Sequence, residues 1–367
     1  MRLIHPTVSR RTVLAAATAT ATAALYGARA AAAFPTPPRL FGAAVQARQI
    51  LVDKGFRDAV IRECGAITPE LELKWDFIES ESGEINLRPA DQLVDFAMRF
   101  GKQVHGHTLV WHRGMPAWAV QALLEAPDWR LIERFFALVL PRYADAIGSW
   151  DVVNEPFAIG ARADGLRETP MLKAFGPDYI RRSFEAAHRM APRARLYLNE
   201  FGLLYSFPQS VAKRAAVLRL LEDLRAKDVP IHGLGVQAHL ELARMDAFDA
   251  AGLAAFLDAI AALGLDIRIS ELDVTEADTT APADVRDARA GQAVRTLLDV
   301  LDAFKGRRAL SGITCWGLSD RYSWLPPQSE SAGLNRGLPL DSDLREKPMF
   351  HVLEDFLRPA NRGIAGA

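Results

Sequence analysis

The chain has 367 residues and a formal net charge of −1 at pH 7; 50% of its residues are hydrophobic and 24% are charged. This composition is ordinary for a globular protein with a large core. No stretch of basic residues is interleaved with aromatic ones, so we expect no nucleic-acid partner. Cys64 and Cys315 are too few for a disulfide framework, and we interpret both as buried free thiols.

The first 33 residues differ in kind from the rest. Twin arginines, Arg10 and Arg11, precede an apolar run rich in Ala, Thr and Leu, and a stretch of small residues follows. This order is typical of a twin-arginine export signal, and the apolar run is too short for a permanent membrane anchor. An Ala-rich disordered tail is the alternative. We predict a signal peptide over residues 1–33, a catalytic domain over residues 34–367, export to the periplasm or secretion, and no membrane attachment after signal cleavage.

Beyond this segment, short apolar runs alternate with longer runs of helical period, as in βα units. The expected strands span residues 39–45, 66–68, 103–109, 149–153, 195–199, 231–237, 266–272 and 312–318. The expected helices span residues 56–63, 90–100, 129–143, 178–190, 211–226, 247–263, 285–304 and 348–356. Eight strands each followed by a helix predict an α/β fold, a single (β/α)8 TIM barrel. An open doubly wound sheet would carry a glycine-rich loop after its first strand, where this chain has Gln46-Ala47-Arg48.

The carboxyl ends of barrel strands are where barrel enzymes carry their active sites. Seven of the expected strands end in polar or aromatic side chains, in chain order Glu70, Glu72, Lys74 and Trp75; His107, Trp111 and His112; Asn154 and Glu155; Asn199 and Glu200; Gln237 and His239; Glu271 and Asp273; Trp316 and Asp320. Each such residue alone is more often structural, for example as the partner of a helix dipole. Their agreement on one rim favours an active site.

Glu155 and Glu271 would face each other across the mouth of this barrel. Glycosidases need such a pair, because one carboxyl group protonates the leaving oxygen while the other attacks the anomeric carbon. His239 and Asp273 could keep Glu271 ionised and oriented, which makes Glu271 the better nucleophile candidate. Asn154 offers an amide for a sugar hydroxyl. Flat apolar faces suited to sugar rings are offered by Trp111, Trp316 and Trp324.

Several motifs in this order resemble glycoside hydrolase family ten, the endo-β-1,4-xylanases. They are Thr-Pro-Glu-x-Glu-x-Lys-Trp at 68–75, Gly-His-Thr-Leu-Val-Trp-His at 106–112, Trp-Asp-Val-Val-Asn-Glu-Pro at 150–156, Gln-Ala-His at 237–239, Ser-Glu-Leu-Asp at 270–273 and Trp-Gly-Leu-Ser-Asp-Arg-Tyr-Ser-Trp at 316–324. The match runs from about residue 40 to residue 355, although Asn-Glu-Pro alone occurs in a wider clan of barrel glycosidases.

The resemblance implies a retaining endo-1,4-β-xylanase that hydrolyses internal bonds of xylan by double displacement. Glu155 would be the acid/base and Glu271 the nucleophile, which His239 and Asp273 would orient. The sugar-binding positions would be Glu70, Lys74, His107, Trp111, Asn154, Gln237, His239, Trp316 and Trp324. Xylan and xylo-oligosaccharides would be the substrates, with no cofactor and no metal, and we expect a monomer.

Two positions depart from the family pattern. Leu71 stands where an Asn usually binds the sugar one place beyond the cleaved residue, and Phe201 stands where a Tyr is usual near the leaving group. Each replaces a hydrogen-bonding group with an apolar one. The departures bear on subsite strength and substrate preference, and whether Leu71 packs under its loop or faces the sugar stays open.

Three other functions are compatible with parts of this sequence pattern. His105 and His107 share a strand face, as in a metal-dependent hydrolase, but that pair normally lies on the first strand and no third ligand set stands out. A non-catalytic sugar-binding barrel would be favoured if either glutamate were missing. A retaining β-1,4-glucanase would need room for a hydroxymethyl group beside Trp316 and Trp324, which the sequence does not show.

Overall fold

The computed structural model describes residues 40–357 except 277 and 326–334. The predicted signal peptide, residues 1–33, lies outside the described residues. Within the described ranges, no helix combines the length and the apolar character needed to cross a membrane.

Eight parallel strands close into a barrel, which confirms the predicted fold. They are β1 (Leu40–Val45), β2 (Ala66–Pro69), β3 (Gln103–Trp111), β4 (Ile147–Asn154), β5 (Arg195–Glu200), β6 (Gly233–Val236), β8 (Asp266–Thr275) and β9 (Leu310–Cys315). Neighbours in this order pair in parallel, and β9 pairs with β1 to close the ring. A short extra strand, β7 (His239–Glu241), pairs with the far end of β8.

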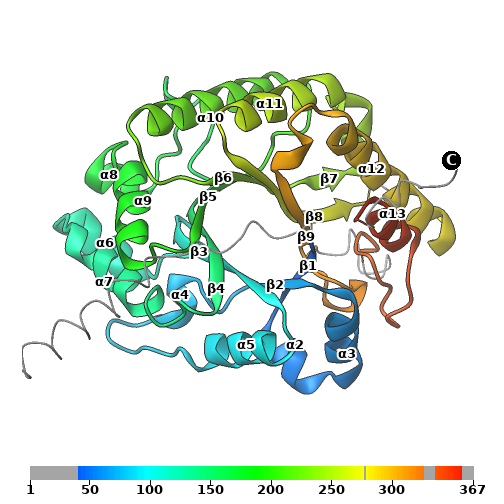
Figure 1. Cartoon of the computed structure of the whole chain (residues 1–367), viewed down its shortest axis with the longest axis horizontal. Coiled ribbons are helices and arrows are strands. Elements are labelled where there is room, and N and C mark those ends of the chain that lie inside the picture. Colours follow the sequence, from blue (N-terminus) through cyan, green and yellow to red (C-terminus); the bar gives the residue numbers. More distant parts are fainter. Residues whose placement is uncertain (1–39, 277, 326–334, 358–367) are drawn as a thin grey trace, which may run out of the picture.

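The helices form a ring outside the strands (Figure 1). They are α2 (Ala47–Val52), α3 (Lys54–Glu63), α4 (Trp75–Ile78), α5 (Arg88–Arg99), α6 (Ala117–Glu125), α7 (Trp129–Val139), α8 (Pro170–Phe175), α9 (Tyr179–Met190), α10 (Pro208–Ala226), α11 (Ala250–Ala262), α12 (Ala283–Ala303) and α13 (Pro348–Leu357). The described residues also include short 3₁₀ turns: η1 (Leu242–Ala247) between β7 and α11, η2 (Arg307–Ala309) between α12 and β9, and η3 (Asp320–Tyr322) after β9. Because helices cover the outside and side chains fill the inside, β2, β6 and β9 are buried along their whole length.

The sequence predicted each barrel strand and most of the helices, but it missed the nine-residue α6 and the shorter elements. Helices α2, α4 and α8 have six, four and six residues, too few to display a helical period. The strand predicted over residues 231–237 is shorter in the structure, where β6 spans Gly233–Val236, and just beyond the predicted run Ala238 has a φ of 61°, which separates β6 from β7. This break turns the chain so that β7 begins at His239.

Irregular pairing marks the strands that carry the predicted site residues. The register shifts between His107 and Val110 on β3, between Asp151 and Val153 on β4, and between Ile269 and Leu272 on β8. Bulges next to active sites re-aim side chains at the rim of a barrel.

Both cysteines are buried and free, as predicted. Burial raises the pKa of the Cys64 thiol to about 12, so this thiol stays protonated at neutral pH.

Candidate active site

Amide side chains from three strand ends join the two glutamates. The Asn199 side-chain nitrogen donates to Glu271 Oε1 at 2.6 Å and to Asn154 Oδ1 at 2.9 Å. Asn154 in turn donates to Glu155 Oε1 at 3.4 Å. The Gln237 Nε2 atom lies 3.3 Å from Glu155 Oε1 and 3.3 Å from Asn154 Oδ1. The two glutamates predicted at the mouth, Glu155 and Glu271, therefore share one network of amide side chains.

Asn199 is the residue of this network to which the sequence assigned no role. It is fully buried, and Ser270 Oγ donates to its Oδ1 at 2.6 Å, which leaves its nitrogen facing Asn154 and Glu271. The strand register gives the reason, since Asn154 and Asn199 are paired residues on β4 and β5. The sequence signal that could have revealed the role of Asn199 is the presence of an asparagine at the end of each of two successive strands, Asn154 and Asn199.

His239 links Glu271 to a second carboxylate. Its Nδ1 lies 2.9 Å from Asp273 Oδ1 and its Nε2 lies 3.3 Å from Glu271 Oε2. Burial alone would lower the pKa of His239, but the Asp273 and Glu271 carboxylates outweigh burial and raise it to about 10. The ring is therefore a cation at neutral pH and donates from both nitrogens. The structure thus brings His239 and Asp273 together beside Glu271, and an orienting role for them stays a prediction.

Asp273 is also the acceptor for Trp324. The buried Asp273 takes a hydrogen bond from Trp324 Nε1 at 2.7 Å, and the Trp324 ring centroid is 5.5 Å from that of His239. Trp324 is 49% exposed, whereas Trp316 is 8% exposed. One predicted tryptophan thus presents a solvent-accessible face beside the nucleophile candidate, and the other lies deeper in the barrel.

A second cluster of predicted residues surrounds Lys74. The Lys74 Nζ atom is 4.7 Å from the Trp111 ring centroid and 5.9 Å from that of Trp316. The His107 ring packs edge-on against Trp316 with centroids 5.1 Å apart. These rings and the ammonium together form a mixed aromatic and polar surface, which suits a ligand with apolar faces and hydroxyl edges.

The charges of this cluster compensate one another. Burial raises the pKa of Glu70, while a hydrogen bond from Gln46 and the charge of Lys74 oppose that effect. Burial lowers the pKa of Lys74, while the negative charges of Glu271 and Glu70 oppose it. Gln46 was not predicted as a site residue, although it directly follows β1.

His105 and His107 both face Asp151 inside the barrel. His107 Nδ1 is 2.9 Å from Asp151 Oδ2, and His105 Nε2 is 3.0 Å from Asp151 Oδ1, without the alignment of a hydrogen bond. The other His105 nitrogen contacts Ser149 Oγ at 2.7 Å. Over residues 40–357, apart from the gaps, no three His, Cys, Asp or Glu side chains are grouped to hold a metal ion. The metal-hydrolase alternative therefore finds no ligand set there.

The two residues that depart from the family pattern are both partly accessible. Phe201 is 37% exposed, and the Lys213 Nζ atom lies 3.9 Å from its ring centroid. Leu71 is of intermediate exposure and is not among the partly buried side chains that pack against the core. Leu71 is therefore not part of the hydrophobic core.

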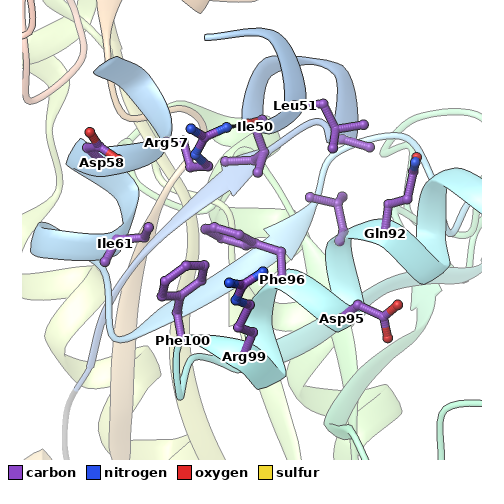
Figure 2. A pocket seen from close by; sticks show the side chains of 12 residues that line it. Ile50, Leu51, Arg57, Asp58, Ile61, Gln92, Asp95, Phe96, Arg99 and Phe100 are labelled. Carbon is purple, nitrogen blue, oxygen red and sulfur yellow. Dashed lines mark hydrogen bonds between the residues drawn. The ribbon is translucent and has the colours of Figure 1, made fainter. Parts of the chain in front are cut away.

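A hollow with a volume of about 590 Å³ lies on the outside of the barrel between α2, α3 and α5 (Figure 2). Apolar side chains such as Ile50, Phe96 and Phe100 line it, together with charged ones such as Arg57 and Asp95. It contains none of the predicted site residues, so the strand-end rim remains the candidate active site.

The charge state of His239 gives a pH-dependent contribution to stability. The folded-state pKa of about 10 exceeds the ordinary value of 6.5, so the contribution is complete below pH 6.5 and is lost as pH rises towards 10. We expect the unfolding free energy of the wild type minus that of His239→Gln to fall across this window, by at most about 1.4 kcal/mol per pH unit. Denaturant unfolding at several pH values measures it.

The matched control is His351→Gln, since the exposed His351 ring lies 3.8 Å from Glu346, beyond hydrogen-bond distance. Its difference from the wild type should stay flat over the same window. A flat difference for His239→Gln as well, or one that grows with pH, contradicts the assignment of a cationic His239.

The chain is similar in sequence and in structure to known xylanases. The chain is 34% identical over 298 residues to endo-1,4-beta-xylanase 2 of Claviceps purpurea, covering 81% of this chain and 83% of that protein. It is 31% identical over 281 residues to a beta-1,4-xylanase of Dictyoglomus thermophilum, covering 74% and 75%. Among solved structures, xylanase 10B from Thermotoga maritima superimposes with a TM-score of 0.76 at 27% identity, covering 88% of this chain and 95% of that one.

Xylanase 10B from Thermotoga petrophila RKU-1 in complex with xylobiose gives a TM-score of 0.75 at 26% identity, covering 87% and 94%. The sequence profile of glycosyl hydrolase family 10 matches residues 30–356. That match takes in every strand of the barrel and both glutamates of the amide network. With the closed barrel and this network at its strand ends, the chain is a glycoside hydrolase that belongs to glycosyl hydrolase family 10.

Proposed function

We propose that this chain is a retaining endo-1,4-β-xylanase in which Glu155 is the acid/base and Glu271 is the nucleophile. The observation that carries the role assignment is the asymmetry of the amide network. Both glutamates contact neutral amides, but only Glu271 also contacts the cationic His239. The named relatives and structural neighbours are xylanases, which favours xylan over glucan as substrate.

In the first step, the Glu155 carboxyl group gives its proton to the glycosidic oxygen while a Glu271 oxygen attacks the anomeric carbon. The bond from that carbon to the leaving oxygen breaks, and a covalent ester to Glu271 forms. In the second step, the Glu155 carboxylate takes a proton from water, and the water oxygen displaces Glu271 from the same carbon. Two displacements at one carbon give overall retention of configuration.

The surroundings of Glu271 suit a nucleophile. The hydrogen bond from Asn199 to Oε1 and the contact of Oε2 with His239 fix both oxygens. Burial lowers the pKa of Lys74, and the charges of Glu271, Glu70, Asp76 and Glu155 oppose this effect, Glu271 most and Glu155 least. Among the described residues, the Glu155 carboxyl group has only the long contacts with Gln237 and Asn154, which leave it available to a leaving oxygen.

Sugar binding is proposed for the residues that the resemblance indicated: Glu70, Lys74, His107, Trp111, Asn154, Gln237, His239, Trp316 and Trp324. The buried Trp111 Nε1 has no hydrogen-bond partner in the part of the chain that the structure describes, so it is a donor available to a hydroxyl group. The half-exposed Trp324 offers a ring face next to His239.

Export remains a proposal that the amino-terminal sequence supports. The Arg10-Arg11 pair and the apolar run after it favour a twin-arginine signal over residues 1–33, and a periplasmic or secreted enzyme. A polymer such as xylan is met outside the cell, which agrees with this location. We also propose that the mature enzyme acts as a monomer, free of membrane and nucleic acid.

The two glutamates should give different phenotypes. Glu155→Ala should lower kcat/KM on xylan by about 10²- to 10⁴-fold but spare aryl xylobiosides with good leaving groups, because these need no proton. Glu271→Ala should abolish turnover on both substrates, and azide should restore it on the aryl substrate with inverted product. Steady-state kinetics and ¹H NMR of the azide product measure this.

Glu241→Ala is the matched control, since the Glu241 carboxylate on β7 pairs with Arg244 at 3.0 Å, two residues past His239. It should keep activity on both substrates. Equal losses on activated and unactivated substrates for Glu155→Ala and Glu271→Ala would mean that the roles are wrongly assigned.

Leu71→Asn should strengthen the neighbouring sugar subsite. Leucine cannot donate to a sugar hydroxyl, and one net hydrogen bond is worth roughly 0.5 to 1.5 kcal/mol, or about two- to tenfold in kcat/KM. The gain should appear on xylotetraose, which fills the subsite, and not on an aryl xyloside, which does not reach it.

Leu51→Asn serves as the control, because Leu51 is a 53% exposed leucine on α2, and it should change neither substrate. If Leu71→Asn lowers the melting temperature and brings no gain on xylotetraose, Leu71 is a packing residue and the subsite prediction is wrong.

A further inference from the structure

Glu155 has a backbone conformation that few residues other than glycine adopt. Its φ is 55°, in the left-handed region, and the residue that follows it is Pro156, which disfavours helical conformations in the residue before it. Such a conformation persists only where the surroundings over-determine it, and it is typical of functional sites. We therefore expect the contacts that impose this backbone conformation on Glu155 to affect the reaction.

One side chain and its own peptide hold three consecutive carbonyl groups in this turn. The Arg167 Nε atom donates to the Glu155 carbonyl oxygen at 3.0 Å, and its Nη2 donates to the Phe157 carbonyl oxygen at 2.9 Å. The Arg167 peptide N–H donates to the Pro156 carbonyl oxygen at 2.7 Å. A guanidinium has its donors in a rigid fork, so two contacts to alternate carbonyls fix both distance and orientation.

The opposite side of the same turn is held by carboxylate and backbone acceptors. Glu200, which is fully buried, accepts from the Phe157 N–H at 3.1 Å and pairs with Lys213 at 3.0 Å. The Glu155 N–H donates to the Asn199 carbonyl oxygen at 2.9 Å. With Arg167 on the carbonyl side and these acceptors on the amide side, the peptides around Glu155 have little freedom.

The Glu155 carboxyl group, in contrast, is held loosely. Its two side-chain contacts, with Gln237 and Asn154, are 3.3 and 3.4 Å long, at the weak end for hydrogen bonds. The direction of the carboxyl group must therefore come from the backbone. A general acid works only within hydrogen-bond reach of the oxygen that it protonates, and a small displacement is costly in rate.

We propose that Arg167 is a positioning residue for the acid/base: by clamping the carbonyl groups of Glu155 and Phe157, it aims the Glu155 carboxyl group at the glycosidic oxygen. This inference rests on the proposed role of Glu155 and adds to it the residue that sets its direction. Arg167 touches the backbone of Glu155 and is not itself a proton donor in the reaction.

A leaving-group comparison separates positioning from a merely structural role. Arg167→Met removes both side-chain donors but keeps the peptide contact to Pro156. We expect it to lower kcat/KM on xylotetraose, which needs the proton, by about tenfold to a hundredfold, and on 2,4-dinitrophenyl β-xylobioside, which does not, by less than about threefold. Arg167→Lys retains one cationic donor and should recover part of the loss on xylotetraose.

Arg162→Met is the matched control, because Arg162 lies on the same loop and pairs with Asp164 at 2.8 Å instead of contacting the Glu155 turn. It should leave both substrates within about twofold of the wild type. Melting temperatures are recorded for all variants. If Arg167→Met does not fold, Arg167→Lys is tested on the same two substrates. A loss of kcat/KM on xylotetraose that exceeds the loss on the aryl xylobioside then supports the proposal.

Equal losses on both substrates, or no loss on xylotetraose, overturn the positioning role. Glu155→Ala on the same substrates keeps this outcome distinct from a failure of the proposed function. If Glu155→Ala is selective and the Arg167 variants are not, only the positioning inference fails. If Glu155→Ala also loses both substrates equally, the acid/base assignment itself fails.

Discussion

The side-chain amide of Asn199 has two N–H groups, and each is used by a different part of the site. One donates to Asn154, which contacts Glu155, and the other donates to Glu271. Ser270 holds the amide oxygen, so the group cannot rotate without leaving buried polar atoms unpaired, at a cost of about 1–3 kcal/mol. The pairing of Asn154 with Asn199 on adjacent strands sets this contact, so the register of the closed barrel determines the relation between the two glutamates.

From this shared amide, the two glutamates enter different environments. The cationic His239 lies between the carboxylates of Glu271 and the buried Asp273, so charges alternate along this row. Trp324 Nε1 donates to the other Asp273 oxygen, Oδ2. Glu155 has neutral amides at its carboxyl group and an arginine on its backbone. Two carboxylates with unlike neighbours are what a mechanism with one proton donor and one nucleophile requires.

The barrel fold and most of the candidate site residues could be predicted from the sequence. The strands and helices of a barrel alternate regularly, and barrel enzymes carry their active sites at the strand ends. The positions of Glu155, Glu271, His239 and Asp273 follow from that rule. The linking role of Asn199 did not, since it depends on the register between two strands. Arg167 gave no signal at all, because its hydrogen bonds go to backbone carbonyl groups, which any sequence supplies.

The break between β6 and β7 was also hidden, because the turn at Ala238 uses a φ of 61° that alanine seldom adopts. Without that turn His239 could not pair opposite Asp273. The resemblance implied a sugar-binding role for Trp324. The structure adds that its indole nitrogen holds Asp273, which ties the tryptophan to the nucleophile's orientation.

In the proposed mechanism, Glu271 forms a covalent bond to the substrate while Glu155 moves the proton. The most direct measurement is trapping with 2,4-dinitrophenyl 2-deoxy-2-fluoro-β-xylobioside, followed by proteolysis and tandem mass spectrometry of the labelled peptide. The fluorine slows both displacements and the good leaving group restores the first, so a glycosyl-enzyme should accumulate. We expect one label per chain, on Glu271; a label on Glu155, or inactivation without any covalent adduct, would show that the roles of the two glutamates are wrongly assigned.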